Sequence, residues 1–196
     1  MELEIKRLTP ALVEDYLHFF DVTPHDDDIA GSKCYCVCWC SADHRLPAEL
    51  DTQEKRRRTA REYVRSGTIQ GYLAYADGEV VGWCNANAKA DCLHCYSWMR
   101  FMGAVDGDDR GLKVKSVFCF VITPRWQRQG VATALLQRVC EDAKADGFDA
   151  VESYPKKEFA SVARDFMGPS VMYRKAGFTV YAEKDDGELV MRKLLA

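Results

Sequence analysis

The sequence contains no long hydrophobic run, no excess of basic charge and no low-complexity stretch. Its longest unbroken apolar segment, residues 117–122, is far shorter than the roughly 20 residues that a membrane-spanning helix needs. The 27 basic side chains are outnumbered by 30 acidic ones, so no basic patch of the kind that binds nucleic acid is indicated. The acidic, polar residues 1–4 are unlike a signal peptide. We therefore expect a cytoplasmic protein without nucleic-acid or membrane partners.

Nine cysteines are the unusual feature of the composition. In a reducing cytosol they are expected to be mostly free thiols. Four of them alternate through residues 34–40, a pattern that predicts a strand. Alternate residues of a strand lie about 6.6 Å apart, which is too far for thiolates that share one zinc ion. We predict no metal, although a bent chain that adds Cys92, His94 and Cys95 leaves a zinc site open, and thiols that are buried or line a pocket are the other interpretation.

The order of expected elements favours one domain with a mixed sheet. No repeat of 20–50 residues divides the chain, so residues 1–196 are taken as a single domain of the α/β or α+β class. Asp77-Gly78 is typical of a tight type I′ hairpin turn. Strands are expected at residues 2–8, 34–40, 71–76, 79–87, 113–122, 149–154, 178–183 and 188–194, helices from Pro10 onward and at residues 26–28, 51–66, 127–145, 158–166 and 169–176, and an irregular connection at residues 88–111.

The segment after the most apolar strand has the composition of an anion-binding loop. Residues 117–122 run into Thr123-Pro124-Arg125-Trp126 and then Gln127-Arg128-Gln129-Gly130-Val131-Ala132. A strand, turn and helix in this order leave free N–H groups at a helix N-terminus, where the helix dipole also favours negative charge. The spacing matches neither a P-loop nor a Rossmann fingerprint. A pyrophosphate cradle and a glycine that merely permits close helix packing are both open on this evidence.

A second motif, Tyr173-Arg174-Lys175-Ala176-Gly177-Phe178, follows about 45 residues later. The two motifs in this order resemble the GCN5-related N-acetyltransferase (GNAT) family, in which Gln/Arg-x-x-Gly-x-Gly/Ala binds the pyrophosphate of coenzyme A. The resemblance covers about residues 70–195 and includes Gly82-Trp83, and details such as Gly82-Trp83-Cys84 are similar to a bacterial subgroup of unassigned substrate. It implies a mostly antiparallel central sheet that splays at the cofactor strand, flanked by helices.

The resemblance also implies roles for individual residues, with acetyl-CoA as the cofactor. Main-chain groups of Phe120, Val121 and Ile122 would bind the pantetheine arm, an N–H near Phe120 or Val121 would stabilise the oxyanion, and the pyrophosphate would contact Gln127, Arg128, Gln129, Gly130, Val131, Ala132 and Thr133. Tyr173 would be the general acid and Glu152 the general base. Residues 1–70 would form the acceptor side and residues 71–196 the cofactor-binding core.

These roles lead to one leading hypothesis and one alternative. The leading hypothesis is direct transfer of acetyl to a primary amine of a small molecule or peptide by a bacterial enzyme. A homodimer is one of the assembly states left open. The alternative is a non-catalytic sensor or interaction protein that binds coenzyme A. Two structural interpretations also stay open: Glu152 pairs with an arginine, and Tyr173 packs the late helix. Aromatic and apolar residues are either acceptor-side or core residues: Trp39, Trp83, Tyr96, Trp98, Met99 and Phe101.

Overall fold

The structure is a computed structural model and describes residues 2–24, 33–40, 50–102, 109, 111–162, 165–184 and 187–195. The helix expected at residues 26–28 lies outside the described residues. The elements are β1 (Glu4–Arg7), η1 (Pro10–Leu12), α1 (Val13–Val22), η2 (Val37–Trp39), α2 (Gln53–Ser66), β2 (Gly71–Ala76), β3 (Glu79–Ala88), α3 (Lys89–Cys92), α4 (Tyr96–Phe101), β4 (Val114–Ile122), η4 (Pro124–Trp126), α5 (Val131–Ala145), β5 (Ala150–Ser153), α6 (Ser170–Lys175), β6 (Thr179–Glu183) and β7 (Leu189–Leu194).

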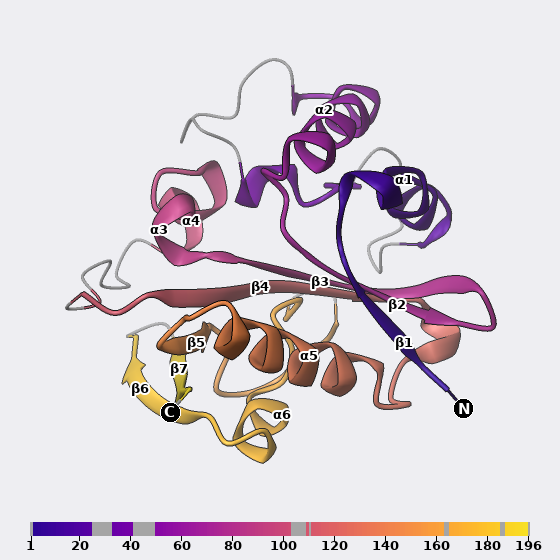
Figure 1. The fold of residues 1–196 in the computed structure, drawn as a ribbon. Coiled ribbons are helices and arrows are strands. Elements are labelled where there is room, and N and C mark those ends of the chain that lie inside the picture. Colours follow the sequence, from indigo (N-terminus) through magenta and orange to yellow (C-terminus); the bar gives the residue numbers. More distant parts are fainter. Residues whose placement is uncertain are drawn as a thin grey trace.

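Seven strands form one mixed sheet in the order β1-β2-β3-β4-β5-β7-β6. Strands β4 and β5 are parallel, and the other neighbouring strands are antiparallel. Helices cover both faces, with α5 on one side of the sheet and α1 and α2 on the other (Figure 1). The mixed sheet expected from the sequence is therefore confirmed.

Alternation along β2 explains the two layers. Tyr72 and Ala74 pack into the core beneath α5, whereas Leu73 and Tyr75 belong to the core beneath α1, because successive side chains of a strand point to opposite faces. The hairpin to β3 turns at Asp77, whose φ angle is 53°, as its Asp-Gly sequence predicts. The hairpin of β6 and β7 is confirmed as well.

Four local expectations are wrong. Residues 34–40 form a turn and the short helix η2 rather than a strand, because Tyr35 and Cys36 adopt left-handed φ angles of 47° and 52°, which break an extended chain. Residues 158–162 and 165–166 are not helical. Residues 88–111 include the helices α3 and α4, and α5 begins at Val131 rather than at residue 127.

The sheet divides in the middle of β4. Strand β5 pairs with β4 only from Val114 to Val117, while β4 continues to Ile122 along β3. The N–H of Phe120 donates instead to the carbonyl of Phe166 at 2.7 Å. The second half of β4 thus has an edge that no strand covers among the described residues.

None of the helices in the described ranges combines the length and the apolar character that crossing a membrane requires.

Candidate active site

The loop between β4 and α5 presents backbone donors at the start of a 15-residue helix. Gly130 is the N-cap of α5 and has a φ angle of 87°. The Ala134 N–H donates to the Gly130 carbonyl, so Val131, Ala132 and Thr133 precede the first N–H bonded within the helix. These three N–H groups point out of the positive end of the helix dipole. The arrangement is suited to an anion.

Gly130 serves the backbone conformation rather than close packing. A Cβ atom added to it would have no atom within 4 Å, which removes the packing interpretation. Its positive φ angle is one that glycine adopts at little cost. The loop is braced by the Gln129 side chain, which donates to the Arg125 carbonyl at 2.6 Å, and by the Gln127 side chain, which donates to the Ile122 carbonyl at 3.3 Å.

A cavity of about 600 Å³ opens from this loop, and we call it the loop cavity. It reaches from the loop along the uncovered edge of β4 to the chain between β5 and α6. Eight of the ten cofactor residues predicted from the sequence line it: Phe120, Ile122, Gln127, Arg128, Gly130, Val131, Ala132 and Thr133. The lining of the cavity does not include Val121 or Gln129.

A second cavity, of about 300 Å³, lies on the other side of the same stretch of β4, and we call it the thiol cavity. Cys34, Cys36, Cys38 and Cys119 line it together with Trp39, Tyr96 and Phe101. The two cavities share five lining residues: Phe120, Ile122, Gln127, Val162 and Phe166. They therefore meet at the C-terminal half of β4.

The other aromatic candidates from the sequence lie elsewhere. Trp83 and Trp98 are buried in cores, and Met99 is exposed.

Successive N–H groups of β4 point alternately toward β3 and toward the opening where the two cavities meet. The Thr123 N–H donates to Val81 of β3, so alternation turns Val121 toward β3 as well. Phe120 and Ile122 face the opening, where the Phe120 N–H is bonded to Phe166. The Ile122 N–H, rather than that of Phe120 or Val121, is the donor of β4 that points to the opening.

Comparison with known proteins agrees with this architecture. A family model described as "Acetyltransferase (GNAT) family" matches residues 32–167. The chain belongs to the GNAT family. Acetyl-CoA is the cofactor of GNAT enzymes, and acyl transfer from it is their general reaction. No curated protein matches the sequence.

Solved structures share the GNAT fold at low identity. A GNAT acetyltransferase from Streptococcus pneumoniae is 19% identical, with a TM-score of 0.56 and all of both chains covered. A polyamine N-acetyltransferase from Drosophila melanogaster is 12% identical, with a TM-score of 0.58 and 99% of each chain covered. The ribosomal-protein-S18-alanine N-acetyltransferase from Escherichia coli is 13% identical, with a TM-score of 0.50 and coverage of 100% of this chain and 95% of that one.

The predicted base, Glu152, lies in a buried network of charges. Its carboxylate accepts from Lys89 Nζ at 2.8 Å, from Arg192 Nε at 2.7 Å and from the Tyr154 hydroxyl at 2.8 Å. Lys89 and Arg192 also bind Asp109. Glu152 is 0% exposed and lines neither the loop cavity nor the thiol cavity. The interpretation in which Glu152 pairs with an arginine is the one that this geometry supports.

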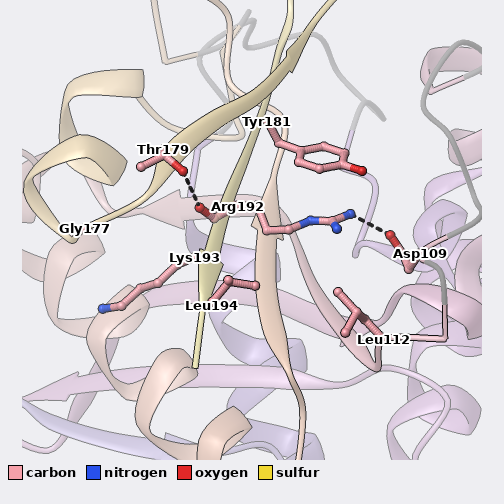
Figure 2. Close-up of a pocket in the computed structure, with 8 residues that line it drawn as sticks. All are labelled: Asp109, Leu112, Gly177, Thr179, Tyr181, Arg192, Lys193 and Leu194. Atoms are coloured by element: carbon pink, nitrogen blue, oxygen red, sulfur yellow. Dashed lines mark hydrogen bonds and ion pairs between the residues drawn. The ribbon is translucent and has the colours of Figure 1, made fainter. Parts of the chain in front are cut away.

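The outer edge of this network borders a further hollow on β6 and β7 (Figure 2). Figure 2 shows the Arg192 guanidinium directed at Asp109. The central carbon of that guanidinium, Cζ, lies 4.0 Å from the centre of the Tyr181 ring. The Lys193 ammonium, which extends to the opposite side, donates to the Ala176 carbonyl. Both cations in this hollow are therefore engaged within the protein.

The predicted acid, Tyr173, is fully buried behind the loop cavity. Its hydroxyl donates to the Met167 carbonyl at 2.5 Å, and both Met167 and Tyr173 are buried. Burial raises the pKa of Tyr173 well above its ordinary value. The neighbouring Met172 lines the loop cavity, whereas Tyr173 is absent from that lining.

Asp165 is a carboxylate of the site that the sequence reasoning missed. Its Oδ2 accepts the N–H groups of Ala160 and Ser161, while Oδ1 is buried and has no hydrogen-bond partner in the described part of the chain. The residue is 5% exposed and lines the loop cavity next to Phe166, which lines both cavities. No local motif marks it, because its position depends on a non-helical connection where the sequence predicted a helix.

Two of the thiols that line the second cavity, Cys36 and Cys38, have raised pKa values and are protonated at neutral pH. Burial raises the pKa of Cys38 to about 11. The pKa of Cys36 is raised well above its ordinary value, first by its contact with the Cys119 thiol and further by burial. Within the described ranges, no group of three His, Cys, Asp or Glu side chains is arranged to hold a metal ion.

Replacing Glu152 by glutamine tests its structural role. The variant leaves Lys89 and Arg192 short of one negative charge in a buried site, so we expect a loss of about 3–5 kcal/mol in the free energy of unfolding. Acetyl transfer per folded molecule should stay within about twofold, since a change of that size corresponds to less than 0.5 kcal/mol. Urea denaturation and turnover measure the two quantities.

Glu141→Gln is the matched control, because Glu141 is exposed on α5 and should change neither quantity. A Glu152→Gln protein of normal stability with strongly reduced turnover would restore Glu152 as the base.

Proposed function

We propose that this protein is an acetyl-CoA-dependent N-acetyltransferase that transfers acetyl directly to the primary amine of a small molecule or peptide. The observation that carries the proposal is the meeting of two cavities at β4. One is lined by the anion-binding loop at the start of α5 and the other is open to a second ligand. Direct transfer requires such a junction, because both reactants must be held within reach of each other.

In this proposal the loop cavity holds the cofactor. The N–H groups of Val131, Ala132 and Thr133 bind the diphosphate, and the Arg128 guanidinium adds a charge-assisted donor. The pantetheine arm follows the uncovered edge of β4, where the backbone groups of Phe120 and Ile122 face the opening. The Ile122 N–H is our candidate for stabilising the oxyanion, since it is directed to the place where charge develops.

Asp165 is our candidate for receiving the proton of the amine. An alkylammonium group with a pKa near 10.4 is neutral in only about one molecule in 2,500 at pH 7, so a proton acceptor is required. Asp165 is the one carboxylate among the described residues that line the two cavities. Its Oδ1 has no partner among the described groups but is buried, so in this proposal the side chain turns toward the cavity before it accepts from the ammonium group, directly or through one water. We assign Glu152 a structural role instead.

Tyr173 remains our prediction for the proton donor. Because burial raises its pKa, the phenol keeps its proton at neutral pH. It can return that proton to the departing thiolate once its hydroxyl leaves the Met167 carbonyl. The adjacent Met172 already contacts the cavity in which that thiolate forms.

The broader predictions are carried forward as part of the proposal. We propose one domain, with an acceptor side formed by residues 1–70 and a cofactor-binding core formed by residues 71–196. Nine cysteines without a disulfide among them favour a reducing compartment such as the bacterial cytoplasm. A homodimer is retained as a prediction. The thiol cavity and the free oxygen of Asp165 favour an enzyme over the alternative of a sensor that only binds coenzyme A.

Replacing Thr133 by glutamate tests the diphosphate site. A carboxylate in the first turn favours the helix but repels the diphosphate, so we expect the Kd for acetyl-CoA to rise about tenfold, or about 1.4 kcal/mol. Isothermal titration calorimetry measures the Kd, and thermal unfolding should show no loss of stability in the free protein. Thr133→Gln, of similar size without the charge, should bind nearly normally. Equal affinity of the two variants would contradict the assignment.

Replacing Asp165 by asparagine tests the proton acceptor. We expect kcat to fall about 100-fold, with the Kd for acetyl-CoA unchanged. Glu158→Gln provides a matched control, since Glu158 is exposed in the same connection. A higher Kd for acetyl-CoA with normal kcat would show that Asp165 holds the pantetheine arm instead.

Replacing Tyr173 by phenylalanine tests the proton donor. We expect kcat to fall about 100-fold while the Kd for acetyl-CoA stays the same. Calorimetry and steady-state rates separate the two effects. Unchanged kcat would leave Tyr173 with packing alone, as its contact with the ring of Phe178 at a centroid distance of 5.3 Å allows.

A further inference from the structure

The walls of the thiol cavity carry no formal charge in the part of the chain that the structure describes. Three thiols come from the turn at residues 34–38 and a fourth, Cys119, comes from β4. Aromatic rings and aliphatic side chains supply most of the remainder, and Ser97 and Gln127 are the neutral polar side chains of the lining. Such walls favour an apolar ligand group, because burying one there releases water from apolar surface on both partners.

The thiols do not change this neutrality. A thiolate would offer a negative charge to a cationic ligand, but Cys36 and Cys38 have raised pKa values and stay protonated at neutral pH. A protonated thiol behaves as a small, polarizable apolar group. Cys36 and Cys38 therefore present an apolar surface to the cavity rather than an anionic one.

Two cations in the described part of the chain, Arg56 and Arg100, lie beside this cavity. The Arg56 guanidinium lies close enough to Cys38 to lower the pKa of that thiol, against the larger effect of burial. Its Nε donates to the Lys33 carbonyl at 2.8 Å and its Nη1 to the Leu50 carbonyl at 2.9 Å, which fixes its position. On another wall, the Arg100 guanidinium donates to the Tyr96 hydroxyl and lies 5.3 Å from the centre of the Phe101 ring. Both cations disfavour a ligand that brings a second ammonium group.

One carboxylate serves the junction itself. Asp165 lies beside Phe166, where the two cavities meet, and has one free oxygen. Once the side chain turns toward the cavity, that buried oxygen can accept from one ammonium group at the reacting end. A second ammonium group of a diamine would have to be desolvated in the thiol cavity without a counter-charge from its described lining, which is costly.

We propose that the acceptor is a primary monoamine that bears one apolar group, aromatic or branched aliphatic, packed against the Cys34–Cys36–Cys38 turn and Trp39. This inference rests on the proposed N-acetyltransferase function and names its substrate class. The volume of about 300 Å³ is at the lower end for ligand pockets and leaves enough room for an apolar group the size of a phenyl ring. The uncharged lining and the two neighbouring cations of the described residues disfavour polyamines and other polycations.

Rates of acetylation with matched amines test the proposal. The amines are 2-phenylethylamine and 3-methylbutylamine, compared with 1,5-diaminopentane and spermidine. The products are measured by mass spectrometry, because the protein's own thiols would react in an assay for free coenzyme A. We expect kcat/KM for the apolar amines to exceed that for the diamine at least tenfold.

Two variants at the cavity wall sharpen the test. Cys34→Asp adds a carboxylate to the lining and should shift the ratio of kcat/KM at least tenfold toward 1,5-diaminopentane. Cys34→Ser adds no charge and should keep the preference of the unmodified protein. Should Cys34→Asp fail to fold, the comparison of amines on the unmodified protein still decides the proposal.

Thermal unfolding with and without millimolar acetyl-CoA separates the two levels of inference. Stabilisation by acetyl-CoA together with equal or better use of the diamine, or with no use of either apolar amine, overturns the substrate class and leaves cofactor binding intact. Absence of any stabilisation overturns the proposed function itself.

Discussion

The separation of β5 from β4 after Val117 is the constraint on which the site depends. A strand that continues without a neighbour exposes N–H and C=O groups that must find other partners. In this structure the carbonyl of Phe166 accepts a hydrogen bond from the N–H of Phe120, and the side chain of Gln127 donates one to the carbonyl of Ile122. Both partners belong to segments that line the two cavities. The backbone requirement of one uncovered edge thus brings the loop, β4 and the chain before α6 together.

The same separation explains why the carboxylate of Glu152 is fully paired within the protein, whereas that of Asp165 is not. Glu152 of β5 lies opposite Ser116 of β4, where the two strands are still paired. There it is sealed within the sheet, and Lys89 and Arg192 compensate its charge. Asp165 belongs to the connection after β5 and lines the loop cavity. Its buried Oδ1 has no hydrogen-bond partner among the described groups. The carboxylate on the strand after α5 is therefore neutralised by ion pairs within the protein, whereas the one from the irregular connection lines the loop cavity, where we propose that it receives a proton.

The sequence correctly predicted the mixed sheet and the GNAT family, and the details that it predicted correctly are local ones. The Asp77-Gly78 hairpin follows from the φ angles that a tight turn needs, and the loop before α5 follows from a glycine that must have a positive φ angle. The turn at Tyr35 and Cys36 was missed because residues with side chains rarely adopt left-handed angles. There they are held by long-range contacts, such as the Tyr16 hydroxyl on the Tyr35 carbonyl and the Trp83 indole on the Cys36 sulfur. The roles of Glu152 and Asp165 depend on partners and cavities that no spacing in the sequence reveals.

Burial of the thiols has a chemical consequence for a protein that handles a thioester. A thiolate beside acetyl-CoA would attack its carbonyl and exchange the acetyl group, since the thiolate is the nucleophilic form of cysteine. Cys36 and Cys38 line the thiol cavity, which meets the loop cavity, yet their raised pKa values keep them protonated. The wall that favours an apolar amine is therefore also one that does not compete with the amine for the acetyl group. In this arrangement, amine selectivity and protection of the thioester both follow from thiols that stay protonated, Cys36 through its contact with the Cys119 thiol and burial, and Cys38 through burial.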